Sequence, residues 1–170
     1  MIEDMPLSKI QWIDVNKLKA NDYNPNVVLT NELKLLQLSM LKNGWIQPVL
    51  VTQDYDIIDG FHRSTLCKIN KDINKMTDGK VPCVVLNLSK PERILLTVRI
   101  NRAKGNHIAL KMNKLIQELI NTYGLSKKYV AENLGATERE IELLLYDDVF
   151  DKYKLTEETL YSEAWKPKVD

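Results

Sequence analysis

The chain has 170 residues and a formal net charge of +1, with 44% hydrophobic and 28% charged residues. This composition is typical of globular proteins, and no run of roughly 18 consecutive apolar residues is present to span a membrane. The first residues lack the basic and apolar regions of a secretion signal, and two cysteines are too few for a disulfide framework. We therefore expect a reduced, cytoplasmic protein with no membrane partner.

The positive charge is concentrated in the middle of the chain. Residues 62–128 hold 14 Lys/Arg against 4 Asp/Glu, whereas residues 1–61 hold 5 against 8 and residues 129–146 hold 1 against 4. Such a segment favours anionic ligands, although a solvated basic surface would give the same count.

The first part of the chain alternates short apolar runs with segments of helical periodicity, which predicts a small α/β (α+β) unit with a mixed sheet. Thr30 and Gly44 are typical of the two ends of a helix, and Ser89 with Glu92 has the spacing of a capping box. The expected elements are strands at 10–13, 48–51, 55–58 and 81–86, helices at 30–42, 61–70 and 89–102, and a polar loop at 72–80.

The remainder is predicted to be all-helical, with helices at 108–123, 126–134 and 137–146. A small residue, a glycine and two apolar anchors fall where a helix-turn-helix requires them. These residues are Ala131, Gly135, Ile141 and Leu144. We predict three parts, namely an α/β domain at 1–107, a helix-turn-helix segment at 108–146, and an acidic tail at 147–170 with at most one short helix.

The most informative motif is Asp59-Gly60-Phe61-His62-Arg63, in which an apolar strand ends at a glycine and a helix begins. A helix N-terminus presents backbone N–H groups and a partial positive charge, so it favours an anion, as do His62 and Arg63. A plain strand-to-helix turn with an exposed arginine would have the same pattern. If Arg63 binds a phosphate, Arg63→Ala should weaken nucleotide binding roughly ten- to a hundred-fold while the fold survives, because this residue starts a helix and anchors no apolar cluster. A second cluster of cations and amides spans residues 99–107.

Several segments together resemble the ParB/sulfiredoxin superfamily, in the order and spacing of ParB. They are Asn24-Pro25, Gly44-Trp45-Ile46-Gln47-Pro48, Ile58-Asp59-Gly60-Phe61-His62-Arg63, Val81-Pro82-Cys83-Val84-Val85 and Asn101-Arg102. The sequence Asp-Gly-Phe-His-Arg is similar to the corresponding motif in ParB-like proteins of phages and mobile elements.

The resemblance implies a nucleotide-binding domain at residues 1–107 and a nucleoside triphosphate, CTP or ATP, with Mg²⁺. By this resemblance, Asn101 would bind the Mg²⁺ ion that accompanies the nucleotide. Asp22 is the one carboxylate nominated as a catalytic base. The implied nucleotide-binding residues are Gln47, Asp59, Gly60, Phe61, His62, Arg63, Asn101, Arg102, Lys104 and His107.

Two positions depart from the family patterns. Phe61 occupies the place of the sulfiredoxin cysteine, which excludes that chemistry, and Cys67 and Cys83 are expected to be core residues. Ile100 stands where ParB has a glutamate, and an apolar side chain cannot orient water or metal, so we expect slow or no nucleotide hydrolysis.

The helical segment offers four candidate DNA contacts, which are Lys127, Lys128, Thr137 and Arg139. The second helix of the pair is acidic, because Glu138, Glu140 and Glu142 lie in it, and three glutamates oppose a phosphate backbone. DNA binding and a protein-binding helical module therefore remain as alternatives.

The leading hypothesis is a nucleotide-dependent, ParB-like DNA-binding or transcription-regulatory protein, in which nucleotide orders residues 101–107 and repositions the helices. One alternative is an ATP-dependent enzyme of the superfamily, a small-molecule kinase, NTPase or nuclease. Another is a partner-binding module for a DNA-modification or defence enzyme encoded by a neighbouring gene. A homodimer is compatible with each.

Overall fold

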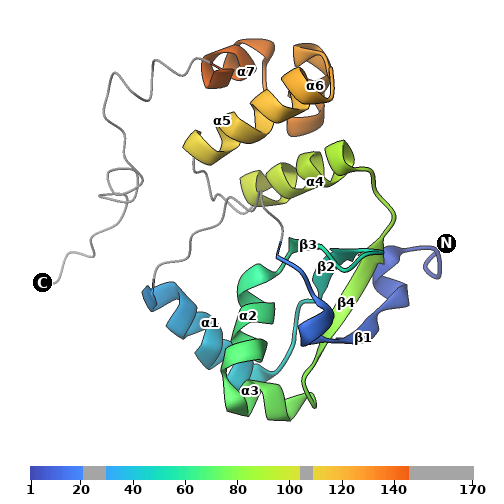
Figure 1. The fold of residues 1–170 in the computed structure, drawn as a ribbon, viewed down its shortest axis with the longest axis vertical. Coiled ribbons are helices and arrows are strands. Elements are labelled where there is room, and N and C mark those ends of the chain that lie inside the picture. Colours follow the sequence, from blue (N-terminus) through green and yellow to red (C-terminus); the bar gives the residue numbers. More distant parts are fainter. Residues whose placement is uncertain (21–29, 104–108, 146–170) are drawn as a thin grey trace, which may run out of the picture. The chain divides into compact units, whose positions relative to one another are not determined.

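The computed structural model describes residues 1–20, 30–103 and 109–145 (Figure 1). By internal contacts the chain divides into two compact units, Met1–Thr97 and Val98–Asp170. The boundary between the units falls within one helix, α4 (Lys90–Ala103). No helix in the described part of the chain is long and apolar enough to cross a membrane.

The first unit is built on a four-stranded mixed sheet with the strand order β1-β4-β2-β3. β1 (Gln11–Asp14) pairs antiparallel with β4 (Lys80–Leu86), and β4 runs parallel to β2 (Val49–Thr52). β2 forms an antiparallel hairpin with β3 (Ile57–Asp59). All four expected strands are present, within one or two residues of the predicted bounds, and the expected mixture of sheet and helices is confirmed.

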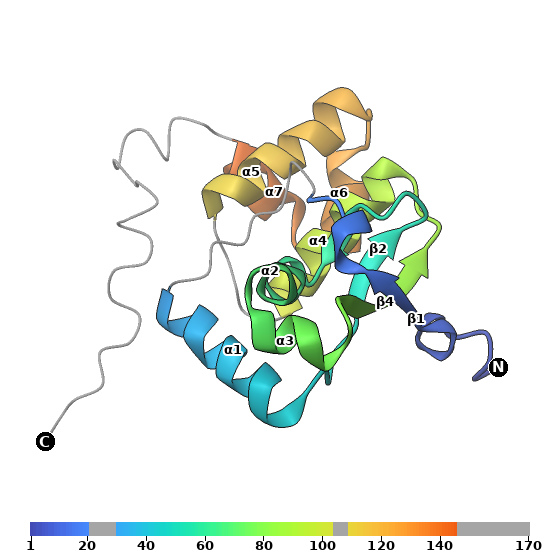
Figure 2. The ribbon, with the colours of Figure 1, turned by 60° about the horizontal axis from the view of Figure 1, so that its bottom comes forward.

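The main core lies on one face of this sheet, under α1 (Thr30–Asn43), α2 (Phe61–Ile69) and α3 (Lys71–Met76), as Figure 2 shows. Alternate strand residues point to this face because side chains alternate along a strand. The buried residues of this core are Ile13, Val15, Met40, Val49, Val51, Ile57, Leu66, Cys67, Ile73, Val81 and Cys83.

Both cysteines are core residues, as predicted, and each is fully buried. Burial raises the pKa of the Cys83 thiol to about 12 and also raises that of Cys67. The thiolate is the reactive form of cysteine, so neither side chain can serve as a nucleophile in the folded protein.

The prediction of a polar loop over residues 72–80 was wrong, because helix α3 occupies residues 71–76. The side chain of Asn70 caps this helix by accepting hydrogen bonds from the backbone N–H groups of Asp72 and Ile73, at 3.0 and 3.1 Å. Ile73 then anchors the helix in the core, where it is 1% exposed. The cap and one apolar contact therefore outweigh the polar composition of the segment.

The capping box at Ser89 is present at the start of α4. The Ser89 N–H donates to Glu92 Oε2 at 2.8 Å, and the Ser89 hydroxyl donates to the same oxygen at 2.6 Å. Farther along α4, the Thr97 hydroxyl donates to the Ile58 carbonyl of β3 at 3.4 Å, so this part of α4 belongs with the sheet.

The described helices of the second unit lie where the sequence predicts them. α5 (Ala109–Gln117) continues into a π-helix (Glu118–Thr122), and α6 (Lys127–Leu134) and α7 (Glu138–Leu145) follow. The Ser126 hydroxyl caps α6, and Gly135 takes a left-handed conformation in the turn before α7, with φ of +62°. Buried apolar residues hold these helices together, and they are Leu115, Ile116, Leu119, Val130, Ala131, Leu134 and Ile141.

Candidate functional site

Gly60 joins β3 to α2 in a conformation that other residues rarely adopt. Its φ is +98°, and a Cβ atom added there would lie 3.1 Å from both Val49 Cγ2 and Arg63 Nη2. The chain can therefore begin α2 directly against β2 only with glycine at this position. The backbone N–H groups in the first turn of α2 point outward along the helix axis. They favour a negative charge at this end of the helix.

Arg63 gathers three of the residues that sequence analysis proposed for nucleotide binding. Its Nη1 atom donates to Gln47 Oε1, and its Nη2 atom lies 3.3 Å from Asp59 Oδ2 in a salt bridge. The side chains of Arg63 and Asp59 are only 12% and 15% exposed. Two separate sequence motifs thus meet at one largely shielded guanidinium group.

This arrangement argues against the expectation that the fold survives replacement of Arg63, because the side chain is largely shielded and has two partners. Burial lowers the pKa of the Arg63 guanidinium from its usual 12.5, and the charge and hydrogen bond of Asp59 act in the opposite direction. The group remains charged at neutral pH. Removing it would take the Arg63 salt bridge away from a half-buried Asp59 carboxylate, which is unfavourable.

Phe61 and His62 form an aromatic pair at the start of α2. Their ring centroids lie 5.5 Å apart with an interplanar angle of 81°, which is an edge-to-face contact. Both residues are half-buried. The first turn of α2 therefore carries a fixed pair of rings beside the Arg63 cluster.

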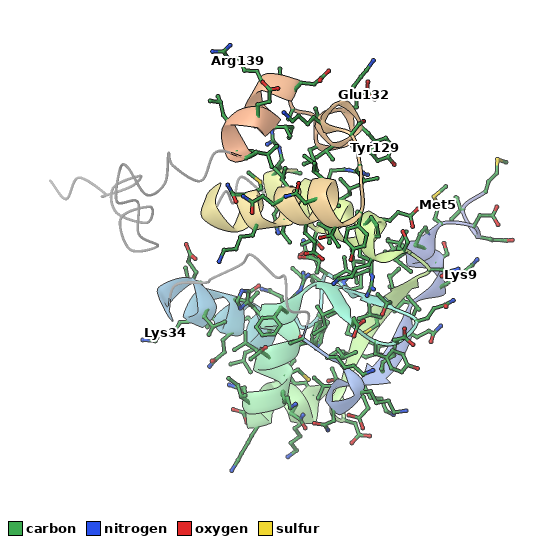
Figure 3. The ribbon with its side chains drawn as sticks, turned by 45° about the horizontal axis from the view of Figure 1, so that its top comes forward. Met5, Lys9, Lys34, Tyr129, Glu132 and Arg139 are labelled. Atoms are coloured by element: carbon green, nitrogen blue, oxygen red, sulfur yellow. The ribbon has the colours of Figure 1, made fainter. Side chains whose placement is uncertain are left out.

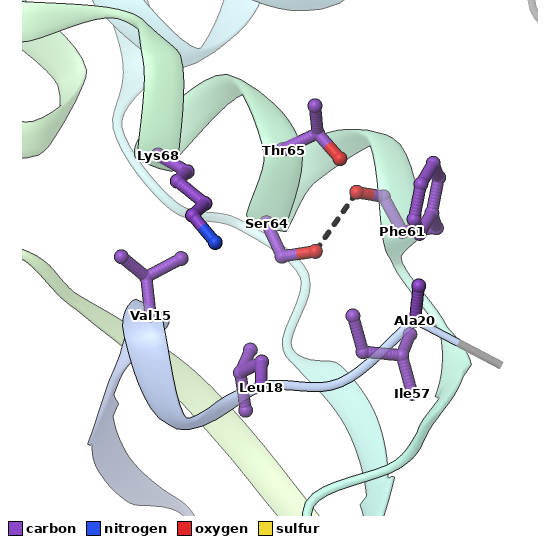
Figure 4. Close-up of a pocket in the computed structure, with 8 residues that line it drawn as sticks. All are labelled: Val15, Leu18, Ala20, Ile57, Phe61, Ser64, Thr65 and Lys68. Carbon is purple, nitrogen blue, oxygen red and sulfur yellow. Dashed lines mark hydrogen bonds between the residues drawn. The ribbon is translucent and has the colours of Figure 1, made fainter.

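A cavity of about 220 Å³ lies along α2, on the side of the helix that carries Phe61, Ser64 and Lys68 (Figure 4). The Ser64 hydroxyl donates to the Phe61 carbonyl at 2.8 Å, and the Lys68 amino group extends toward the centre of the cavity. The full lining is Val15, Leu18, Ala20, Ile57, Phe61, Ser64, Thr65 and Lys68. The lining is mostly apolar, and Lys68 supplies its one charged group. Sequence analysis identified only Phe61 in this lining.

The remaining nucleotide candidates are divided between the second unit and undescribed segments. Asn101 and Arg102 lie in the part of α4 that belongs to the second unit, and Asn101 is 5% exposed. Asp22, Lys104 and His107 lie outside the described residues. Over the described ranges, no group of three or more His, Cys, Asp or Glu side chains could hold a metal ion.

Arg102 has a definite partner, which sequence analysis did not predict. Its Nη1 atom lies 2.8 Å from Glu140 Oε1 of α7. One turn earlier, Arg99 donates to the Asn133 carbonyl at 2.9 Å and to Asn133 Oδ1 at 3.3 Å. The end of α4 is thus joined by arginines to α6 and α7. No local sequence signal reports contacts between residues this far apart.

The DNA candidates lie on α6, on α7 and in the turn between them. Lys127, Lys128, Thr137 and Arg139 are all exposed, and Arg139 projects outward from α7 (Figure 3). Lys127 is paired with Glu142 at 3.2 Å, and the Thr137 hydroxyl accepts from the Glu140 N–H at 3.1 Å. Two of the three α7 glutamates therefore have cationic partners within the unit.

Comparison with known proteins identifies the class of protein to which this fold and site belong. Residues 2–101 match the ParB N-terminal domain, so the chain is a member of that family. It is 32% identical over 167 residues to the uncharacterized protein YbdM of Escherichia coli, covering 96% of this chain and 78% of YbdM. It is 24% identical over 144 residues to the probable chromosome-partitioning protein ParB of Rickettsia bellii, covering 84% of this chain and 48% of that protein. The chain thus spans about half the length of this ParB relative.

Two solved structures share the fold. The Pnob8-like ParB-N domain superposes with a TM-score of 0.61 at 15% identity, covering 88% of this chain and 74% of that one. The C-terminally truncated chromosome-partitioning protein ParB from Caulobacter crescentus, complexed to the centromeric parS site, gives 0.55 at 18% identity, covering 85% of this chain and 77% of that one. At these identities the likeness establishes the fold.

Proposed function

We propose that the chain is a ParB-like regulatory protein that binds a nucleoside triphosphate, CTP or ATP, at Gly60–Arg63. The bound nucleotide controls whether the helical segment binds DNA or a protein partner. The observation that carries this proposal is the convergence of Gln47, Asp59 and Arg63 beside a helix N-terminus that only glycine permits.

The chemistry of these residues suits a phosphate group. Backbone N–H groups at the start of α2 and the planar Arg63 guanidinium offer several donors to one anion, while Asp59 and Gln47 fix the guanidinium orientation. Mg²⁺ bound with the nucleotide would neutralise phosphate charge, and the Asn101 amide is the proposed ligand. Lys104, His107, Arg102 and His62 complete the proposed donor set, and the apolar cavity beside Phe61 would accept a ring.

Thermal unfolding in the presence of CTP, ATP, GTP or ADP, each with Mg²⁺, tests this function. A ligand at about 100 times its Kd stabilises the folded state by about 2.7 kcal/mol. Arg63→Lys keeps a charge opposite Asp59 but loses the fork-shaped donor set, so it should weaken nucleotide binding about tenfold. Arg93→Lys is the matched control, because Arg93 forms a similar pair with Asp56 at 3.0 Å outside the motif. Equal losses in both variants, or no stabilisation of the wild type by any nucleotide, would contradict the proposal.

Binding of a protein partner rather than DNA is the second candidate, and the composition of α7 favours it. Glu138 and Glu142 are exposed on the helix that would enter the major groove. The exposed Tyr129 and Leu143, at 45% and 54%, are more typical of a protein contact than of a DNA contact. Salt-dependent binding of a duplex, measured by fluorescence anisotropy with and without nucleotide, distinguishes the two.

A further inference from the structure

The cavity along α2 presents a lysine to a largely apolar space (Figure 4). Val15, Leu18 and Ile57 form apolar walls, and the Lys68 amino group extends toward the centre. No carboxylate belongs to the described residues that line the cavity. Among these residues, the charged group of Lys68 therefore lacks a counter-charge.

The cavity and the Arg63 cluster lie on different faces of α2. Phe61, Ser64 and Lys68 are spaced by three and four positions, so their side chains share one face of the helix. Arg63 comes two positions after Phe61, and neither Arg63 nor its two partners line the cavity. The cavity is therefore a second candidate site on the helix that carries the proposed phosphate site.

The volume of the cavity sets the size of its occupant. A cavity of about 150 Å³ holds benzene, so a cavity of about 220 Å³ holds a six-membered ring with a short substituent. Phe61 is half-buried and Ile57 is fully buried, and both offer apolar contact to such a ring.

We propose that this cavity binds a small carboxylic acid with an aromatic ring, and that its carboxylate pairs with Lys68. A lysine ammonium group donates three hydrogen bonds and accepts none, so it favours a carboxylate over a neutral substituent. The proposed function allows a ring in this cavity, and Lys68 favours a ring that carries a negative charge, which a nucleobase does not. The Ser64 hydroxyl already donates to the Phe61 carbonyl at 2.8 Å. Lys68 and the Thr65 hydroxyl are therefore the remaining donors among the described lining side chains.

Two ligands of nearly the same shape test the role of charge in the full chain. Phenylacetate carries a carboxylate where phenylacetamide carries a neutral amide. With about ten non-hydrogen atoms, phenylacetate should bind with a Kd on the order of 1 mM. Because Lys68 is an exposed residue, its ion pair should favour phenylacetate over phenylacetamide by about two- to fivefold. NMR titration of the isotope-labelled protein, followed at the backbone amides of α2, measures both affinities.

Substitutions in and beside the cavity identify the group responsible. Lys68→Met removes the charge and keeps an apolar chain, so it should abolish the preference for phenylacetate and retain binding of phenylacetamide. Lys75→Met is the matched control, because Lys75 is an exposed lysine of α3 that does not line the cavity. That variant should keep the wild-type preference. Thr65→Phe fills the cavity with a ring and should block both ligands.

Three results would overturn the proposal. They are equal affinities of the wild type for the two ligands, a preference for phenylacetate that persists in Lys68→Met, and unchanged binding by a folded Thr65→Phe protein. A wild type that binds neither ligand would overturn it as well. None of these outcomes depends on the proposed nucleotide site.

Discussion

The two units each place an arginine from the ParB-like motifs opposite a carboxylate, and the two pairs differ in burial. In the sheet unit, Arg63 and Asp59 are 12% and 15% exposed, and Arg63 also donates to Gln47. In the helical unit, Arg102 and Glu140 are 21% and 43% exposed. Breaking a buried pair leaves an uncompensated charge, whereas an exposed pair contributes little to stability. The first pair therefore contributes more to the stability of its unit than the second does.

The largest expected effect comes from breaking the less exposed pair, Arg63 with Asp59. Arg63→Ala should lower the free energy of unfolding by about 3 kcal/mol, because the half-buried Asp59 carboxylate loses its salt bridge and Gln47 loses its donor. Arg102→Ala should cost less than about 1 kcal/mol, because water solvates Glu140. Urea denaturation at neutral pH, monitored with a probe in the sheet unit, measures both free energies of unfolding.

A double substitution checks the cause of this loss. Arg63→Met combined with Asp59→Leu removes both charges, and it should recover much of the stability lost in Arg63→Ala. Equal destabilisation by Arg63→Ala and Arg102→Ala would show that burial does not separate the two pairs.

The sequence was sufficient to predict the strands, the helices around them and the positions of α6 and α7, because these depend on local periodicity and caps. It also selected Gln47, Asp59 and Arg63 for one site, because the resemblance aligned their motifs. The burial of Arg63 could not be predicted, since it depends on Gln47, which lies 16 positions away in the chain. The same limit hid the partners of Arg102 and Lys127. Helix α3 was missed for another reason: Asn70 and Ile73 supplied a cap and an anchor, but the polar residues around them suggested a loop.

Gly60→Ala should produce the next largest effect. A Cβ at this position would be strained by φ of +98° and would press against Val49 Cγ2 and Arg63 Nη2 at 3.1 Å. We expect a loss of about 2–3 kcal/mol in the free energy of unfolding, together with weaker nucleotide binding as Arg63 shifts. Gly44→Ala is the control, because Gly44 has φ of +72° but open space around its Cβ position. It should cost about 1–2 kcal/mol. A Gly60→Ala protein no less stable than Gly44→Ala would show that the contact with Arg63 carries no strain.

A smaller effect is expected at the two lysines of α6, which are both exposed but differ in whether they form an ion pair. Lys127 pairs with Glu142 at 3.2 Å, whereas Lys128 forms no ion pair within the described residues. If the helical segment binds DNA, Lys128→Ala should reduce the slope of log affinity against log salt by about 0.9. Lys127→Ala should reduce it by less, since that lysine must first leave Glu142. Salt-titrated fluorescence anisotropy measures the slopes, with Lys17→Ala as the surface control. A wild-type protein without salt-dependent DNA binding would instead favour the partner-binding function.

The smallest effect concerns the hydrogen bonds between Ser89 and Glu92 at the start of α4. The hydrogen bonds from the Ser89 hydroxyl and backbone N–H lower the pKa of Glu92 below its usual 4.5. A carboxylate with a lowered pKa stabilises the fold above its unfolded-state pKa, and this stabilisation is lost as the pH falls through the lowered value. Glu92→Gln should therefore be less stable than the wild type at neutral pH, and the difference should shrink as the pH falls below 4.5. Thermal unfolding from pH 7 to pH 3 measures this difference. In a Ser89→Ala background the hydroxyl bond is absent, so the pH dependence of the Glu92→Gln effect should be smaller. A difference that stays constant across this range would mean that the Glu92 carboxylate is not held by Ser89.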